Sequence, residues 1–402
     1  MNDQSGPPPL PDNTPAPSAP PPLPRTSPAA SDPERAMFQV TEQTRTYPCE
    51  SCGAQLVFDP SSQNLLCPSC GRSHAIVIDP GRRVVEHDLA STMTQLRGLL
   101  AATPATPNLG EREVVCQSCG GRSTFTGTLT ATRCPYCATP IQRDDIHAAP
   151  TRLPVDGILP FRVDDEQGRD VIEKWINSRW FAPTEFKKYR ELGSFSSIYA
   201  AYFTYDADTT TSYTGMRGDN YTVTTGSGDN RRTETRTRWS HRSGVVGNEF
   251  DDIAVLANTG FDTERVHELE PWPTGQATPY SPEFVAGHLC RTYDHDADQC
   301  FPIAQSRIDA GVDAAIRRDI GGDHQRISNK DTRYNSLTFK HVLLPIWLLT
   351  VVFAGTPFQV FINGVTGEVQ GQRPWSKVKI AFAVLAALIV IIAIVAAWTA
   401  LK

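Results

Sequence analysis

The chain has 402 residues, of which 40% are hydrophobic and 20% are charged, and its formal net charge is −6. This composition leaves room for two or three globular domains, and its charge gives no overall attraction to nucleic acid or to an acidic membrane surface. Ten cysteines are too few for a disulfide scaffold in a chain of this length. Residues 1–6 lack the basic and apolar regions of a signal peptide, so we expect most of the chain to stay in the cytoplasm.

Residues 1–36 form a leader of low complexity with proline runs at 7–11 and 20–25. Polyproline segments are extended and bury no core, so we expect a disordered, solvated spacer. A ligand for a domain that binds proline-rich sequences is the alternative.

Eight of the ten cysteines fall into four CxxC pairs, arranged as two sets. The first set is Cys49, Cys52, Cys67 and Cys70, and the second is Cys116, Cys119, Cys134 and Cys137. The second set repeats the first 67 positions later, and 14 residues separate the inner cysteines in each. A lone CxxC pair could be redox-active, but this repeated spacing predicts two zinc ribbons, at residues 37–80 and 114–147.

Cysteine thiolates bind Zn²⁺ tetrahedrally, with iron as the main competitor for four-thiolate sites. Each CxxC turn supplies two sulfurs from one loop, and two such turns joined by a short hairpin enclose one metal ion. We therefore expect two Zn²⁺ ions. Because all four ligands are protein thiolates, no coordination position remains for water or substrate, so both sites are predicted to be structural.

Between the ribbons, residues 81–113 form a predicted linker. Leu89, Met93, Leu96 and Leu100 have the spacing of a short amphipathic helix.

Residues 148–376 are predicted to be one mixed α+β domain rich in antiparallel strands. We expect strands at 158–163, at 198–207, and at 213–239 around a turn at 226–228. We expect helices at 166–178, 283–292 and 301–318, and a closing β-meander at 339–354, 358–362 and 366–370. Residues 342–354 are apolar, but thirteen residues are too few to cross a hydrocarbon core of about 30 Å, so we expect a buried strand.

Residues 377–402 are predicted to be a transmembrane anchor. Residues 380–401 contain no charge, proline or glycine, and as a helix they would span roughly 33 Å. Trp375 and Trp398 lie near the two ends, where indole rings favour the membrane interface. The basic residues on the N-terminal side are Arg373, Lys377 and Lys379. This pattern predicts a tail-anchored, single-pass protein of the bacterial plasma membrane with its N-terminal bulk in the cytoplasm, and a buried core helix is the alternative.

Other candidate residues carry weaker signals. Cys290 and Cys300 have no CxxC partner, and we expect them to be small core residues on helices. Residues 294–298 imitate the start of a calcium-binding loop, but Gln299 and Gln305 stand where that loop needs glycine and glutamate.

Residues 319–326 are predicted to be a polar turn after a helix, with Gly321 or Gly322 at the helix C-terminus. A catalytic pair of Asp323 and His324, with His341 nearby, is the enzyme hypothesis for this chain. The sequence contains no GxxxxGK[ST], HExxH or GxSxG motif. We therefore expect a protein that is not an enzyme and has no small-molecule substrate.

Several motifs occur together with the paired ribbons. They lie at residues 269–272, 279–283, 319–326, 340–347 and 363–369. Over about residues 45–375 the chain resembles a family of bacterial membrane proteins with a TFIIB-type zinc ribbon, often labelled primosomal protein N′ or superfamily II helicase. The helicase label does not carry over, because the chain lacks a nucleotide-binding loop. Relatives of this kind are encoded near PspA-like and SPFH membrane proteins, which implies a scaffold that recruits such partners.

Two classes of function follow. The first is an adaptor that gathers cytoplasmic protein partners, PspA-like or SPFH proteins among them, at the inner face of the membrane. The alternative is a zinc-ribbon nucleic-acid-binding protein of the replication or helicase-associated type. Residues 37–150 contain nine arginines, no lysine and ten acidic residues, a balance that argues against nucleic acid.

Overall fold

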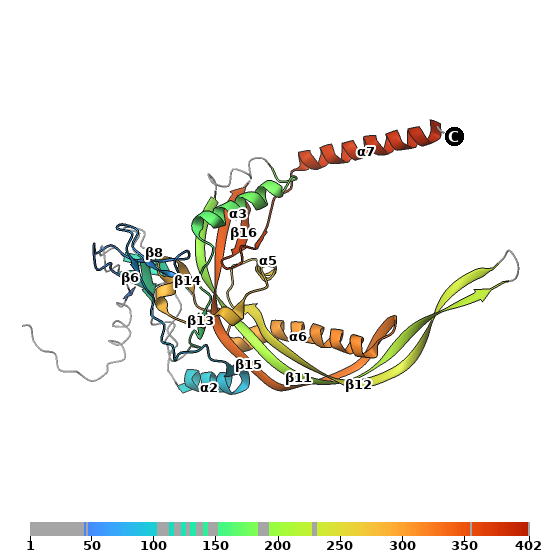
Figure 1. The fold of residues 1–402 in the computed structure, drawn as a ribbon, viewed down its shortest axis with the longest axis horizontal. Coiled ribbons are helices and arrows are strands. Elements are labelled where there is room, and N and C mark those ends of the chain that lie inside the picture. Colours follow the sequence, from blue (N-terminus) through green and yellow to red (C-terminus); the bar gives the residue numbers. More distant parts are fainter. Residues whose placement is uncertain are drawn as a thin grey trace, which may run out of the picture. The chain divides into compact units, whose positions relative to one another are not determined.

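A computed structural model describes residues 44–45, 47–102, 112–115, 122–125, 129–133, 140–143, 152–183, 193–226, 231–353 and 356–400. The proline-rich leader and the four cysteines of the second predicted ribbon lie outside these residues. The described part is α+β, with mostly antiparallel sheets and one apolar helix near the C-terminus (Figure 1). The predicted α+β class with antiparallel strands and one C-terminal apolar helix is therefore confirmed.

Three long strands form the centre of a 12-stranded sheet. They are β11 (Gly193–Thr225), β12 (Arg232–Leu256) and β15 (His324–Phe353). β11 lies between the other two, and it pairs with β15 as far as Gly218 opposite His324. Beyond that point β11 and β12 continue as a two-stranded hairpin (Figure 1). In the described residues β12 pairs only with β11, so its outer edge is open.

The continuity of β11 corrects the sequence analysis, which expected separate strands at 198–207 and 213–239. The stretch between them is polar, yet Thr209 and Thr211 are buried within the sheet. The Thr211 hydroxyl donates to the Thr332 hydroxyl at 3.0 Å, and the Thr209 hydroxyl donates to the Asn248 carbonyl at 3.2 Å. Hydrogen bonds between strands therefore replace apolar packing in the middle of β11.

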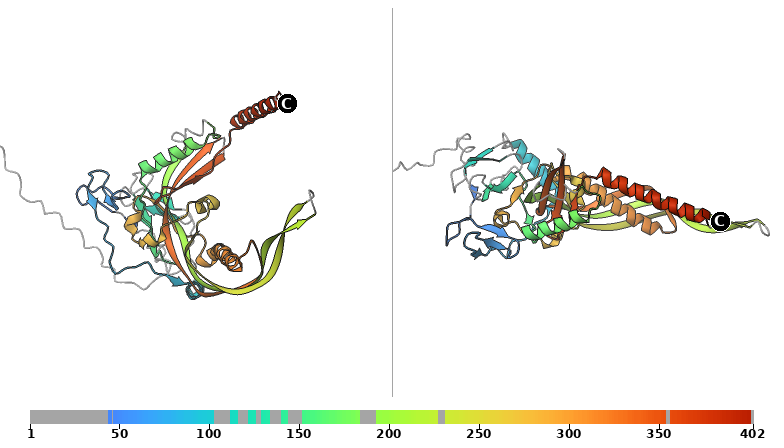
Figure 2. Two further views of the ribbon diagram at one scale, coloured as in Figure 1. Left: turned by 45° about the vertical axis from the view of Figure 1, so that its right-hand side comes forward. Right: turned by 90° about the horizontal axis from the view of Figure 1, so that it is seen from above.

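Helix α6 (Ala297–Ile320) packs on the long strands, as Figures 1 and 2 show. Its buried residues recur every four positions and form one stripe: Cys300, Ala304, Ile308, Val312, Ile316 and Ile320. Asp296 and Gln299 form a capping box at its start, and Gly321 ends it with a φ of 65°. The predicted helix at 301–318 and its glycine terminus are confirmed.

Shorter elements complete the large sheet and its surroundings. The strands are β1 (Thr44–Arg45), β5 (His87–Asp88), β8 (Leu129–Arg133), β9 (Pro140–Arg143), β10 (Gly157–Ile158), β13 (Thr278–Pro279), β14 (Leu289–Arg291), β16 (Thr356–Asn363) and β17 (Val369–Gly371). The helices are α2 (Leu89–Ala102), α3 (Asp165–Ser178), α5 (Thr263–His267), η3 (Thr274–Gln276) and η4 (Pro282–Val285). A small three-stranded sheet contains β2 (Val57–Asp59), β3 (Asn64–Leu66) and β4 (Ser73–His74). A two-stranded sheet contains β6 (Arg112–Val115) and β7 (Arg122–Phe125).

These elements confirm the short helix at 89–100, the helix at 166–178 and the closing meander of β15, β16 and β17. The apolar stretch that begins at Val342 is a buried strand, as predicted. The helix expected at 283–292 is wrong, because this segment is the 3₁₀ turn η4 followed by β14. The strand expected at 158–163 is only the two-residue β10.

The last helix, α7 (Lys377–Ala400), is long and apolar enough to cross a membrane. None of its most apolar stretch is buried within the protein. A core helix of this length would cover much of its surface, so the predicted core-helix alternative is not what the structure shows.

Candidate metal centre

The first ribbon is built from two CxxC turns of the same geometry. The amide of Gly53 donates to the Cys49 carbonyl at 2.8 Å, and the amide of Gly71 donates to the Cys67 carbonyl at 2.9 Å. Both glycines have a positive φ, 73° and 71°, which side-chain-bearing residues rarely adopt. The strands β2, β3 and β4 connect and follow these turns as one antiparallel sheet.

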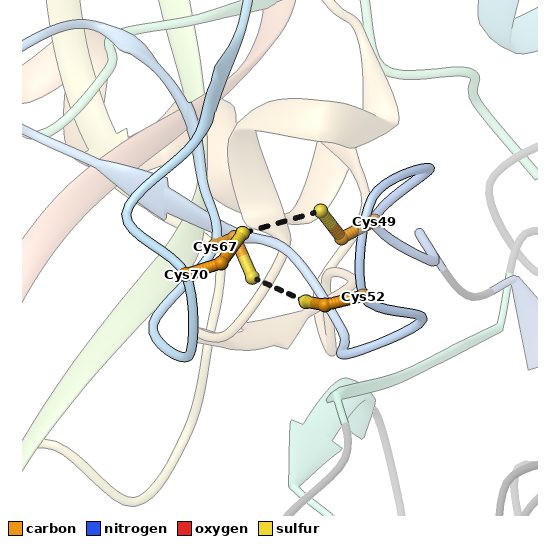
Figure 3. Close-up of side chains that lie close together, drawn as sticks. All are labelled: Cys49, Cys52, Cys67 and Cys70. Atoms are coloured by element: carbon orange, nitrogen blue, oxygen red, sulfur yellow. Dashed lines mark hydrogen bonds between the residues drawn. The ribbon is translucent and has the colours of Figure 1, made fainter.

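The two turns bring four sulfur atoms together (Figure 3). All four Sγ atoms lie within 4.8 Å of one another. Cys49 Sγ is 3.7 Å from Cys70 Sγ, and Cys52 Sγ is 3.4 Å from Cys67 Sγ. A tetrahedral site with metal–sulfur bonds of about 2.3 Å has sulfur–sulfur edges of about 3.8 Å. The four sulfurs thus fit one tetrahedral metal ion.

The electrostatic environment of the thiols also favours the binding of a cation. Backbone N–H groups near Ser51, together with His74, lower the pKa of Cys49 to about 5. The backbone N–H of Ala54 favours the Cys52 thiolate as well, but the neighbouring Cys67 and burial outweigh it and raise the pKa of Cys52 to about 12. Four thiolates this close repel one another, and a divalent cation would offset that repulsion.

His74 is a further residue at this site that the CxxC pattern did not predict. Its Nε2 atom lies 3.8 Å from Cys49 Sγ, and strand β4 places it opposite Leu65 of β3. The signal in the sequence was its position four residues after Cys70, at the start of the strand that leaves the second CxxC turn. An imidazole N–H at this place can hydrogen-bond a metal-bound thiolate and orient it.

The ribbon is docked on the α+β domain. The amide of Phe58 donates to the Ala286 carbonyl at 2.9 Å, and the Phe58 ring packs edge-on against Phe284 with centroids 5.4 Å apart. The Gln63 side chain donates to the Phe161 carbonyl at 2.7 Å. A metal ion in the four-sulfur site would therefore fix a module that is already joined to the main core.

For the second predicted ribbon, the structure describes strands but no ligands. β6 pairs with β7 and β8 pairs with β9, so in the sequence each CxxC pair is flanked by two strands that pair with each other. β8 also pairs with β14, and β9 with β1, which joins this hairpin to the large sheet. Cys116, Cys119, Cys134 and Cys137 lie outside the described residues, and the second metal site stays a prediction.

The other cysteines and the aspartates near them are structural in their contacts. Cys290 and Cys300 are buried, as expected, but Cys290 belongs to strand β14 and not to a helix. Asp296 caps α6, and Asp294 accepts from the Thr259 amide at 2.7 Å and pairs with Arg291 at 3.0 Å.

The residues of the enzyme hypothesis are not brought together. Asp323 accepts a hydrogen bond from the Asn220 amide at 2.7 Å, in the turn before β15. His324 begins β15, whereas His341 lies further along the same strand, after roughly 55 Å of chain at about 3.3 Å per residue. His341 is fully buried, and its Nδ1–H group donates to the Pro154 carbonyl at 2.9 Å.

One acidic cluster, Asp206, Asp251 and Asp252, also gathers possible ligands. The Lys340 ammonium lies 2.8 Å from Asp252 and 3.5 Å from Asp206, so this cluster already has an internal cation. Burial raises the pKa of Asp206 to about 6.

Comparison with known proteins finds one informative similarity. "Uncharacterized protein YdjG" of Bacillus subtilis (strain 168) is 23% identical over 339 residues, which cover 84% of this chain and 92% of that protein. The similarity therefore extends well beyond a single ribbon. No family model matches the chain, and no solved structure matches it.

Proposed function

We propose that this protein is a membrane-anchored adaptor that gathers cytoplasmic partners at the inner face of the bacterial plasma membrane. The observation that carries the proposal is a closed four-sulfur site docked on an α+β domain that leads directly into an exposed apolar helix. This arrangement supplies a rigid surface and an anchor.

The metal is proposed to be Zn²⁺ with a structural role. Four cysteine ligands leave no position for water or substrate, and the ribbon holds its place through Phe58 and Gln63. A second structural Zn²⁺ bound by the cysteines from 116 to 137 belongs to the same proposal.

The orientation follows from charge. Arg373, Lys377 and Lys379 precede the apolar part of α7, and basic residues are retained on the cytoplasmic side of a membrane. The α+β domain and both ribbons would therefore face the cytoplasm. Proteins of the PspA-like or SPFH type are the proposed partners, as the family resemblance implies.

Membrane extraction and pull-down test the proposal together. The full chain should resist alkaline carbonate washing, and a variant that ends at residue 376 should be released. Crosslinking in intact membranes should then recover PspA-like or SPFH proteins with the full chain. Release of the full chain by alkali, or recovery of no specific protein, would overturn the adaptor function.

A further inference from the structure

A polar pocket of about 820 Å³ lies directly before the apolar helix in the chain. Its lining comes from α3, α5, β16 and β17, elements that are distant in sequence. The residues that matter here are Trp175, Arg179, Arg265, Phe358, Arg373 and Trp375. The pocket lies apart from the four-cysteine site, whose ligands line none of it.

The pocket is rich in positive charge. Three arginines line it, and its one carboxylate, Glu268, is engaged by Arg265 at 3.2 Å. Arg179 and Arg373 form no ion pair with any carboxylate of the described residues. Within the described residues, two guanidinium groups are thus left without a carboxylate partner and could bind an anion from outside this part of the chain.

Aromatic rings hold these two guanidinium groups. The Arg179 guanidinium lies over the Trp175 ring at 4.6 Å, and that of Arg373 lies over the Trp375 ring at 4.5 Å. Stacking covers the face of a guanidinium and leaves its N–H edge to bind phosphate or carboxylate oxygens. Such pre-orientation lowers the entropy lost when an anion binds.

Arg179 shows the clearest sign of a missing partner. Its Nε atom is buried and has no hydrogen-bond acceptor within the described part of the chain. Burial lowers the pKa of Arg179, and the positive charge of Arg373 lowers it further. A bound anion would accept a hydrogen bond from the Nε–H group of Arg179. It would also reduce the repulsion between the positive charges of Arg179 and Arg373.

The position of the pocket indicates which anion this is. Trp375 precedes the first residue of α7, Lys377, by two positions, a reach of at most about 7 Å. The start of α7 is bonded to the segment that follows α3, because Ser376 donates to the Phe181 carbonyl and Lys379 to the Ala182 carbonyl, both at 2.8 Å. The headgroup layer on each side of a bilayer is roughly 5–8 Å thick, so the pocket would open at the depth of lipid phosphates.

We propose that this pocket binds the phosphate of an anionic phospholipid, with Arg179 and Arg373 donating to its oxygens. The inference rests on the proposed membrane anchor, since it needs α7 to lie in a bilayer. Exposed Trp180 and Trp375, at 73% and 57% of their full surface, would lie among the headgroups beside it. The site would orient the α+β domain against the membrane, which a single helix cannot do.

The test uses the full chain in detergent, titrated with phosphatidylglycerol or phosphatidylcholine and followed by native mass spectrometry. The unaltered chain should bind phosphatidylglycerol at least about tenfold more tightly, because the choline cation of phosphatidylcholine offsets the charge of its phosphate and would be repelled by the two arginines. The double variant Arg179→Gln/Arg373→Gln should lose this preference. Arg179→Lys/Arg373→Lys should keep part of it, because lysine retains the charge without the planar fork.

The matched control is Arg82→Gln/Arg83→Gln, which removes the same charge from an exposed loop and should keep the preference. An unchanged preference in the Arg179→Gln/Arg373→Gln variant, or an equal loss in the control, would overturn the site. Competition by glycerol 3-phosphate as effective as that of the lipid would assign it to a free phosphate. All variants keep α7 and should resist alkaline washing, so failure of the anchor and failure of the pocket give different results.

Discussion

The first ribbon and the α+β domain differ in what holds them together. Within residues 47–78 only Leu56, Phe58 and Leu65 are buried apolar side chains, apart from two of the cysteines. At about 1.5–3 kcal/mol each, they offset a small part of a chain entropy of about 1–2 kcal/mol per residue. The α+β domain buries an apolar stripe of α6 together with apolar side chains of the three long strands. We therefore expect the small module to need a bound metal, and the large one to be held by apolar packing.

Removing a ligand should give the largest difference between the two regions. Cys67→Ser removes a buried thiolate, so the ribbon should lose its metal and unfold. Hydrogen exchange should accelerate throughout residues 47–78 while β11 and β15 stay protected, and elemental analysis should find one metal ion fewer. Cys300→Ser, a buried cysteine of α6, is the control and should keep the metal. A ribbon that stays protected without metal would contradict the comparison.

A substitution in the core of the α+β domain should have the opposite effect, because it should destabilise this domain and leave the metal site intact. Phe203 is fully buried and packs against Phe339 and Tyr293. Phe203→Ala should lower the free energy of unfolding of the α+β domain by about 3–5 kcal/mol and leave the metal content unchanged. Chemical denaturation with metal analysis on the same sample measures both. Tyr221→Ala, at a partly exposed position on the hairpin, should change stability by less than about 0.5 kcal/mol.

The pH dependence of the α+β domain should give a smaller effect. Burial lowers the pKa of His341 to about 4, whereas an unfolded histidine has a pKa of about 6.5. Above pH 6.5 the imidazole is neutral in both states. As the pH falls toward 4, only the unfolded state takes up the proton, so the free energy of unfolding falls by up to about 3 kcal/mol.

His341→Gln should flatten this dependence between pH 6.5 and 4, as measured by chemical denaturation across that range. His241→Gln, an exposed histidine of β12, is the control and should leave the slope intact. A slope that persists in His341→Gln would assign the acid sensitivity to other groups.

Local sequence patterns were sufficient to predict those features whose interacting residues lie close together in the sequence. The helix expected at 301–318 is α6, where the buried Ile308, Val312 and Ile316 recur every four positions, and the CxxC spacing identified the four sulfurs that the structure brings together. Both signals act within one element or one hairpin.

Elements that depend on distant partners were missed. The segment 289–291 is a strand because it pairs with Ala131 of β8 and Ile198 of β11, far away in the chain. The polar middle of β11 continues as strand because Thr211 finds Thr332, 121 positions away. His74 was overlooked because its place beside Cys49 depends on the register of β3 and β4. No local pattern encodes the pairings of β14 and β11, whereas the position of His74 four residues after Cys70 was a local signal that was overlooked.

With the proposed membrane anchor, the open edge of β12 would matter for copies that share one leaflet. Proteins confined to a plane would collide often, and unpaired strand edges favour edge-to-edge pairing with another chain. The outer half of β12 carries four arginines, Arg232, Arg236, Arg238 and Arg242, of which Arg236 pairs with Glu234 at 3.0 Å. Two such edges brought face to face would set these like charges against each other, so the strand can project from the sheet without polymerising.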